Sequence, residues 1–561
     1  MNQLKPGDYA IFAIYFVLIS WYGYYIYNRK RSKQQGAKDF FLAEGSLTWW
    51  AIGASLIASN ISAEHFIGMS GSGFALGLAI STYEWMSAAT LVIVAVFLLP
   101  VYLKNKIYTM PQFLANRYNS TVSTVMAIFW LLVYVFVNLT SIIYLGALAI
   151  SSVSQIPFAT CVAALAFFSV IVTLGGMKVI GYTDVIQVFV LILGGLTTTY
   201  LALTMVSGHF GFGKDALKGL FLLKEKAPDH FHMIFNSTNP YYKDLPGLSV
   251  LVGGMLINNL AYWGCNQYII QRALGANLKT ARSGILFAGF LKLLIPVIAV
   301  IPGIAAYVLY NNGLFQSSLK DAEGVVKPDH AYPTLLNLLP EGMKGLAFAA
   351  LVAAIIASLA GKANSISTIF SLDIYKPFFN KEASEKKLIS VGRWTVIVSM
   401  LVAALVAPTL KTLDQAYQFI QEYVGFISPG VLAIFLLGMF WKRTNSAAAL
   451  TAACLTIPLS VVLKYIPKVW NLHFLSSTGF SSPVVQTDGT IVYEIPFLDR
   501  MFIVFVVLSI LMTVISLLDP KSKNAKRIID VDASMFRTSP SFIAISVVIV
   551  GILAALYTAF W

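Results

Sequence analysis

The chain has 561 residues, of which 58% are hydrophobic and only 11% are charged, and its net charge is +14. Soluble domains carry about 25% charged residues, so this composition excludes an ordinary water-soluble protein. The basic residues are spread over many short segments, which argues against nucleic acid as a partner.

Apolar stretches long enough to cross a bilayer follow one another along the whole sequence. Residues 9–27, 86–103, 122–153 and 542–560 are examples, and a spanning helix needs about 20 such residues. The pattern predicts an all-α polytopic membrane protein with about 14 transmembrane helices.

Charge on the first connecting segment indicates the orientation. Residues 29–33 are mostly Lys and Arg, whereas residues 1–8 contain a single Lys. Because Lys and Arg stay on the cytoplasmic side, we expect a multi-pass protein of the plasma (cell inner) membrane with both termini outside. The order of basic and apolar segments also argues against a secretory signal peptide.

Enzymatic motifs are missing from the sequence. Cys161, Cys265 and Cys454 all lie in apolar stretches, so no disulfide framework or metal pair is expected. We find no HExxH, P-loop or GxSxG motif. The chain is therefore expected to be neither an enzyme nor a nucleotide-driven pump.

Polar groups inside apolar stretches are the informative exceptions, because a buried charge at mid-depth costs about 2.5 to 3.5 kcal/mol on insertion scales. The densest run is ASLIASNISAEH at 54–65, followed by Gly68, Gly71 and Gly73. It predicts a broken helix whose freed carbonyls can bind a cation. The alternative is a polar loop between two short helices.

Further polar residues lie in separate apolar stretches, and aromatic residues accompany several of them. Each alone can be a helix-to-helix hydrogen bond, but together they predict a polar cavity. Amides, carboxylates and flat rings suit a sugar, which has hydroxyls and an apolar C–H face. The residues concerned are Glu84, Ser87, Asp184, Gln187, Asn258, Asn259, Lys292, residues 358–365 and residues 418–422, with Tyr83, Trp85, Tyr262, Trp263, Tyr417 and Phe419 beside them.

Several strings resemble the sodium/solute symporter family, and within it the sodium/glucose and sodium/galactose cotransporters. They include ASLIASNISAEHFIGMSGSG (54–73), YEWMS (83–87), NQYIIQR (266–272) and QFIQEYVGFISPGVLAIFLLGMFWK (418–442). The resemblance runs in the same order from about residue 40 to about residue 443.

This resemblance implies a leucine-transporter-type core of two inverted five-helix repeats, in which the first helix of each repeat is broken. The breaks would fall around 58–61 and around 258–262. The implied organisation is an extra span and cytoplasmic linker at 1–45, the first repeat at 46–206, an extracellular loop at 207–246, the second repeat at 247–443 and three further spans at 444–561.

The resemblance also implies a sugar site. The hydroxyls would be bound by Asn60, His65, Glu84, Ser87, Asn259, Lys292 and Gln421. Met69, Tyr83 and Tyr417 would form the outer gate, and Tyr262 would stack under the sugar ring on the inner side. His65 stands where bacterial galactose carriers have Gln and animal glucose carriers have His, so the choice of sugar stays open.

The implied sodium ligands are the carbonyls of Ala58, Ile61 and Ala354 and the hydroxyl of Ser358. A second family Ser is replaced by Ala357, so water must complete the oxygen shell or sodium affinity falls. Asp184 matches a carboxylate that helps sodium to leave inward.

Lys362 departs furthest from the family pattern. It lies four positions after Ser358 and therefore on the same helix face, one turn nearer the cytoplasm. We expect its ammonium either to pair with Asp184 and replace part of the sodium charge, or to reach the cytoplasmic interface.

These observations predict sodium-coupled symport of a monosaccharide by alternating access. Sodium is the coupling ion, and the sugar and the lipid bilayer are the partners; a homodimer stays open. The alternatives are proton-coupled or uncoupled transport on the same fold, and a sugar sensor.

Overall fold

The computed structural model describes residues 4–29, 47–321, 323–337, 339–412, 416–486, 489–520, 522 and 529–561. The expected cytoplasmic linker before residue 46 and the basic residues 30–33 lie outside these ranges. The chain forms two compact units: unit 1 is Met1–Glu84, Leu131–His232 and Gln271–Ile420, and unit 2 is Trp85–Trp130, Met233–Ile270 and Gln421–Trp561.

Unit 1 is helical. Its elements are α1 (Pro6–Arg29), α3 (Trp49–Asn60), the π-helix η1 (Glu64–Met69), α4 (Ser70–Leu76), η2 (Gly77–Ser81), the π-helix η4 (Val133–Leu139), α9 (Thr140–Ser154), α10 (Phe158–Leu174), α11 (Gly176–His209), α12 (Ala216–Lys226), η5 (Pro228–His230), α16 (Leu278–Asn311), η6 (Pro328–His330), α17 (Ala331–Leu336), α18 (Met343–Ile369), the π-helix η7 (Phe370–Tyr375), α19 (Lys376–Phe378), α20 (Glu385–Val406) and η8 (Ala407–Thr412).

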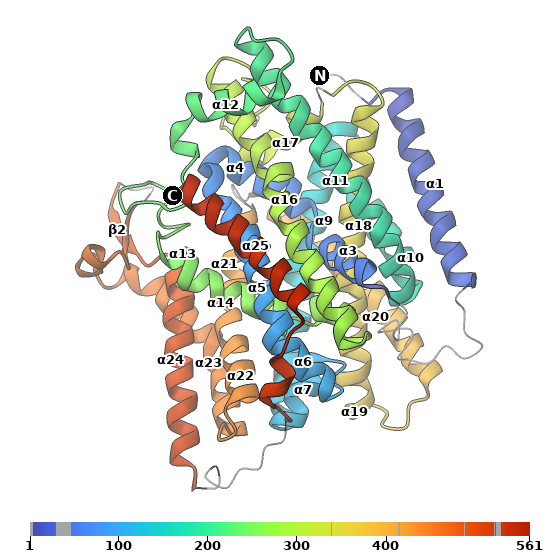
Figure 1. The fold of residues 1–561 in the computed structure, drawn as a ribbon, viewed down its shortest axis with the longest axis vertical. Coiled ribbons are helices and arrows are strands. Elements are labelled where there is room, and N and C mark those ends of the chain that lie inside the picture. The colour runs from blue at the N-terminus through green and yellow to red at the C-terminus, as the bar shows by residue number, and fades with distance from the viewer. Residues whose placement is uncertain are drawn as a thin grey trace. The chain divides into compact units, whose positions relative to one another are not determined.

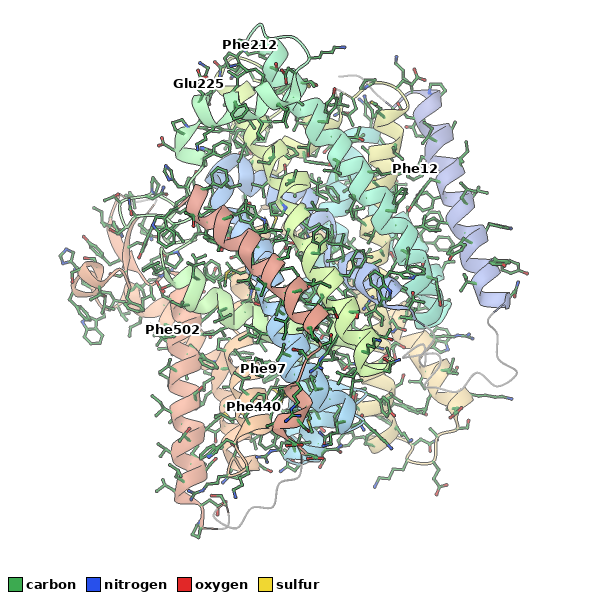
Figure 2. The ribbon with its side chains drawn as sticks, in the orientation of Figure 1. Phe12, Phe97, Phe212, Glu225, Phe440 and Phe502 are labelled. Carbon is green, nitrogen blue, oxygen red and sulfur yellow. The ribbon has the colours of Figure 1, made fainter. Side chains whose placement is uncertain are left out.

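Unit 2 is also mainly helical. Its elements are the π-helix η3 (Val94–Leu98), α6 (Leu99–Lys104), α7 (Met110–Arg117), α13 (Ser249–Val252), α14 (Gly254–Cys265), α22 (Ser428–Phe440), α23 (Ser446–Tyr465), η9 (Ile466–Lys468), η10 (His473–Thr478), β1 (Ser482–Val485), β2 (Ile491–Glu494), α24 (Phe497–Leu518), η12 (Ala533–Phe536) and α25 (Pro540–Ala559). The strands pair antiparallel, with Ser482 opposite Glu494. Phe97 and Phe440, which Figure 2 labels, both pack against Phe536, with ring centroids 5.5 and 6.4 Å from the Phe536 ring centroid.

Some helices cross from one unit into the other along the chain. They are α5 (Thr82–Ile93), α8 (Ser120–Leu132), α15 (Gln267–Leu274) and α21 (Ala416–Gly425).

The helices confirm a polytopic membrane protein. Among the described residues, ten helices are long and apolar enough to cross a membrane, and the number is eleven if Tyr417–Gly425 and Ser428–Phe440, which meet at 44°, form one span. This is fewer than the expected number of about 14, partly because α3, α10 and α14 fall short of 18 residues.

Helix α18 forms the centre of unit 1. It is buried along almost its whole length and packs against α11, α3, α1 and α10 (Figure 1). Ala349, Ala350, Ala353, Ala354 and Ala357 lie on this helix and are all buried. Small side chains let neighbouring helices approach closely, which is how helices associate when lipid removes the hydrophobic driving force.

The first predicted helix break is confirmed. Helix α3 ends at Asn60, because Ile61 adopts an extended backbone with φ −77° and ψ 124°. Helical structure resumes with η1 at Glu64. The freed backbone groups therefore lie within the polar run that the sequence marked as a broken helix.

The second break lies beyond the predicted position. Helix α14 continues through 258–262, where Asn259 Nδ2 donates to the carbonyl of Met255 one turn back at 3.1 Å. The helix ends at Asn266, whose φ is −102° and ψ is 124°. A local side-chain hydrogen bond thus satisfies one of the two asparagines within a continuous helix, and the break falls four residues after Tyr262.

Candidate functional site

Four predicted sugar-site residues gather in unit 1, and we call Asn60, His65, Glu84 and Lys292 the charged cluster. The Lys292 ammonium on α16 donates to both the Glu84 carboxylate and the Asn60 side-chain carbonyl. His65 Nε2 lies 3.2 Å from Glu84 Oε1. The side chains of Lys292 and Glu84 are 0% and 4% exposed. An ion pair this deeply buried is expensive to form, so its presence in apolar helices indicates a functional site.

The backbone of α16 is also altered at this point. Pro296 lies inside the helix, four residues after Lys292. Because proline has no N–H, the carbonyl of Lys292 loses the usual intrahelical donor. The same helix position therefore supplies both a charged side chain and a carbonyl without its regular partner in the helix.

An aromatic cover lies beside the charged cluster, formed by Tyr83 and Tyr417. Their ring centroids are 5.4 Å apart at 86°, and Tyr417 also meets the His65 ring edge to face at 6.3 Å. Tyr83 Oη donates to Gln418 Oε1 at 3.4 Å. A side-chain Cβ at Gly68 would lie 2.8 Å from Tyr417 Cβ, so glycine is needed there for Tyr417 to pack.

The third predicted outer-gate residue, Met69, is fully buried on η1. The structure therefore brings Tyr83 and Tyr417 into direct contact, and it places Met69 on the π-helix that also carries His65.

The predicted sugar-site residues of unit 2 lie in two neutral hydrogen-bonded groups that meet at the neighbouring residues Asn258 and Asn259, and we call them together the amide chain. Ser87 Oγ donates to Asn259 Oδ1 at 2.6 Å, and Asn258 Nδ2 donates to Gln421 Oε1 at 3.4 Å. Ser428, which sequence reasoning missed, donates to Asn258 Oδ1 at 2.9 Å. All the side chains in these three hydrogen bonds are neutral, so this part of unit 2 offers amide and hydroxyl groups.

Tyr262, the predicted stacking residue, lies at the end of α14. Its hydroxyl is hydrogen-bonded to the hydroxyl of Tyr268 on α15, across the break at Asn266, and its ring meets Trp263 at 5.2 Å. Sequence reasoning missed Tyr268, although it belongs to the string NQYIIQR that marked the resemblance.

The predicted sodium ligands lie where α3 meets α18 in unit 1. Ala58, Ile61 and Ala354 are at most 1% exposed. Ser358 Oγ donates to the carbonyl of Ser59 at 2.9 Å, which ties α18 to the last turn of α3. Backbone carbonyls and a hydroxyl are suitable ligands for a hard cation such as sodium.

Lys362 and Asp184 do not have the arrangement that we expected. Lys362 Nζ lies 3.8 Å from Glu64 Oε2. Asp184 Oδ2 instead accepts a hydrogen bond from Ser55 Oγ at 2.5 Å and lies 4.0 Å from Arg272 Nη2. The alternative expectation, that the Lys362 ammonium reaches the cytoplasmic interface, is wrong as well, because the Lys362 side chain is only 2% exposed. A nearer carboxylate, within the polar run at 54–65, pairs with the lysine.

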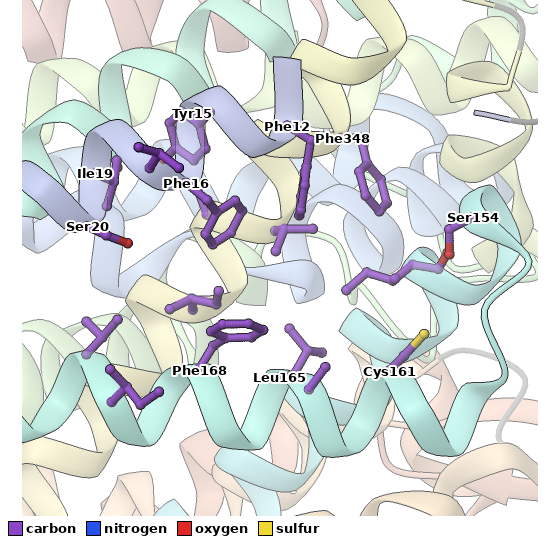
Figure 3. Close-up of a pocket in the computed structure, with 18 of the residues that line it drawn as sticks. Phe12, Tyr15, Phe16, Ile19, Ser20, Ser154, Cys161, Leu165, Phe168 and Phe348 are labelled. Atoms are coloured by element: carbon purple, nitrogen blue, oxygen red, sulfur yellow. The ribbon is translucent and has the colours of Figure 1, made fainter. Parts of the chain in front are cut away.

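A separate cavity of about 720 Å³ lies among α1, α9, α10, α11 and α18 of unit 1 (Figure 3). Its lining is mostly apolar and includes Phe12, Phe16, Phe168 and Phe348, while the polar residues among it include Ser20, Ser154, Thr160 and Gln187. Because a sugar needs many hydrogen-bond partners, this apolar cavity is not the candidate sugar site.

The motif resemblance is confirmed by comparison with known proteins. A family model described as the sodium:solute symporter family matches residues 40–455. The chain belongs to this family. It is 43% identical to the sodium/glucose cotransporter of Vibrio parahaemolyticus, with 100% of both chains covered. It is 34% identical to the human sodium/myo-inositol cotransporter 2, over 80% of this chain and 68% of that protein.

One solved structure has a similar fold. The substrate-bound, outward-open structure of a Na⁺-coupled sialic acid symporter matches the chain with a TM-score of 0.75 at 21% identity, covering 93% of this chain and 99% of that one. At this level of identity the match supports the symporter fold.

Proposed function

We propose that this member of the sodium:solute symporter family is a sodium-coupled symporter of a monosaccharide. The observation that carries the proposal is the charged cluster, in which Lys292, Glu84 and Asn60 are buried and bonded to one another. The full-length relative at 43% identity is called a sodium/glucose cotransporter, which agrees in both the solute and the ion.

The charged cluster has the chemistry to bind hydroxyls. A sugar hydroxyl both donates and accepts, and the pair offers a carboxylate acceptor at Glu84 beside an ammonium donor at Lys292. In the absence of sugar these groups satisfy one another. A sugar therefore exchanges existing hydrogen bonds for new ones and leaves no buried charge unpaired.

The remaining sugar contacts are assigned by resemblance. His65 and Asn60 act with the ion pair, and Ser87, Asn259 and Gln421 of the amide chain bind further hydroxyls. Tyr262 stacks on the ring, and Met69, Tyr83 and Tyr417 gate the outer side. Neutral amides and hydroxyls favour an uncharged substrate over an anion, which would call for Arg.

The sodium ion is assigned to the carbonyls of Ala58, Ile61 and Ala354 and the hydroxyl of Ser358, with Asp184 assisting its release. We assign the chain about 14 spans, of which ten form two inverted five-helix repeats at 46–206 and 247–443, with both termini outside the plasma membrane. Support comes from the two breaks, since Ile61 and Asn266 share the same extended ψ of 124°. Each compact unit also draws stretches from both repeats.

Uptake of labelled sugars into proteoliposomes tests the function. We expect accumulation of a hexose or a polyol driven by an inward sodium gradient, and no accumulation with potassium in its place. Accumulation driven by a pH gradient alone would show that the coupling ion is a proton and not sodium. Sugar binding without any uptake would identify a sensor and refute the proposal.

A further inference from the structure

A second set of buried charges lies beside the candidate sodium ligands and takes no part in the charged cluster. Lys362 on α18 pairs with Glu64, which follows the break between α3 and η1. Two hydroxyls hold the carboxylate: Ser141 Oγ donates to Oε1 at 2.6 Å, and Ser62 Oγ donates to Oε2 at 3.2 Å. The ion pair therefore ties α18 to the residues just after the break.

Two successive turns of α18 reach the two sides of this break. Ser358 donates to the carbonyl of Ser59 on one side, and Lys362, one turn later, pairs with Glu64 on the other. The candidate sodium carbonyls belong to Ala58 and Ile61, within three residues of these contacts. Since an α-helix rises about 1.5 Å per residue, Lys362 lies about 6 Å further along the α18 axis than Ser358.

The charges in this part of unit 1 balance without a sodium ion. Lys362 faces Glu64, and Arg272 faces Asp184. Gly361 makes room for this arrangement, because a Cβ at that position would lie 2.5 Å from Arg272 Nη2. A bound sodium ion adds one positive charge to a set of two cations and two carboxylates that is already neutral. Like charges this close repel in a medium of low dielectric constant.

We infer that Lys362 sets the sodium requirement of this transporter: its ammonium competes with the coupling sodium ion for the negative charge of Glu64. The inference rests on the proposed function and specifies how its sodium site is tuned. Ala357 acts in the same direction, since it removes one oxygen ligand. Both features weaken sodium binding, so the transporter needs a high external sodium concentration for half-maximal uptake.

The test measures sugar uptake by proteoliposomes against external sodium, with binding of radioactive sodium to the purified protein as a second readout. Lys362→Met should lower the half-saturating sodium concentration by about tenfold or more, because Glu64 is then available to the ion. Glu64→Gln leaves the ammonium uncompensated and should raise that concentration by a similar factor. A loss of packing would not shift the half-saturating sodium concentration in opposite directions in the two variants.

Two further variants keep the test decisive. Lys362→Arg retains the positive charge and should keep the natural sodium requirement. Lys344→Met removes another buried lysine of α18, whose ammonium donates to the carbonyl of Asn337 at 2.7 Å. It lies 18 residues away, about 27 Å along the helix, and should not change the sodium requirement.

The outcomes separate this inference from the proposed function. A half-saturating sodium concentration within about twofold of the natural value in Lys362→Met and in Glu64→Gln would overturn the inference. Absence of sugar uptake by the natural protein would refute the proposed function instead, and the sodium-binding readout would still decide the role of Lys362. If Lys362→Met does not fold, the double variant Glu64→Gln with Lys362→Met removes both charges and should bind sodium more tightly than Glu64→Gln alone.

Discussion

The charged cluster of unit 1 and the amide chain of unit 2 consist of residues with the same expected role, yet they are built differently. In the charged cluster, Lys292 and Glu84 are an ion pair without access to water. In the amide chain, Ser87, Asn259 and Gln421 make neutral hydrogen bonds. Breaking a buried ion pair leaves an uncompensated charge, whereas a lost neutral hydrogen bond has a small net effect. The two regions should therefore respond differently to substitution, in stability as well as in binding.

The largest effect is expected for Lys292→Met. It leaves the Glu84 carboxylate buried without its cation, so the free energy of unfolding should fall by about 3 to 5 kcal/mol. Sugar binding should also be lost. Thermal unfolding of the purified protein and calorimetric sugar titration measure the two effects.

The double variant Lys292→Met with Glu84→Gln is the control for this prediction. It removes both charges, so most of the lost stability should return while sugar binding stays absent. If Lys292→Met alone proves as stable as the natural protein, the ion pair is not the element that distinguishes the two regions.

A smaller effect is expected for Gln421→Ala in the amide chain. Sugar affinity should fall by about 1 to 3 kcal/mol through loss of a desolvated hydrogen bond, with little change in thermal stability. Ser428→Ala is the matched control, because Ser428 and Gln421 both contact Asn258 but Ser428 has no proposed contact with sugar. Equal losses of sugar affinity in the two variants would place the sugar contact elsewhere.

Two substitutions of Tyr262 distinguish ring stacking on the sugar from hydrogen bonding by the tyrosine hydroxyl. Tyr262→Phe loses the hydrogen bond to Tyr268 but keeps the ring, so sugar affinity should change by no more than about 1 kcal/mol. Tyr262→Ala also removes the stacking surface and should bind sugar more weakly than the Phe variant. Affinity titrations that find the two variants alike would argue against stacking.

The smallest effect concerns pH and lies in a loop of unit 2, outside the amide chain. Burial raises the pKa of Asp244 to about 6, Lys243 opposes the rise, and Glu422 and Glu494 add to it. The folded protein therefore holds a proton that the unfolded chain has lost, and stability should fall by about 1 kcal/mol as pH rises from about 5 to about 6. Unfolding curves across this range should show a smaller fall for Asp244→Asn. Identical pH profiles would contradict the prediction.

Composition and motif spacing were sufficient for the fold class, the family and the first helix break. A run containing Asn60, Ser62 and Glu64 has no favourable way to continue as a lipid-facing helix, so a break there follows from the residues themselves. The second break, which the family resemblance placed around 258–262, was misplaced, because the resemblance does not reveal that Asn259 bonds back to Met255 within its own helix.

The partners of the buried charges could not be predicted. Helical spacing places Lys362 on the face of Ser358, but it does not say which neighbouring element supplies the carboxylate. In the structure Glu64 lies within reach, while Arg272 accompanies Asp184. Likewise, Glu84 and Gln421 had the same expected role as sugar contacts in the sequence analysis. The ion pair with Lys292 changes that expectation for Glu84.

The π-helical segments η1, η3, η4 and η7 have a consequence for how this chain tolerates changes in length. A π turn holds one residue more than an α turn, so each segment resembles a single-residue insertion that the helix has absorbed. Deletion of one residue from Val94–Leu98 can convert the turn to α while the flanking helices keep their facing side chains. The same deletion in the middle of α18 would rotate every later side chain by about 100°. Single-residue gaps in alignments with family members of other lengths should therefore fall in these four segments.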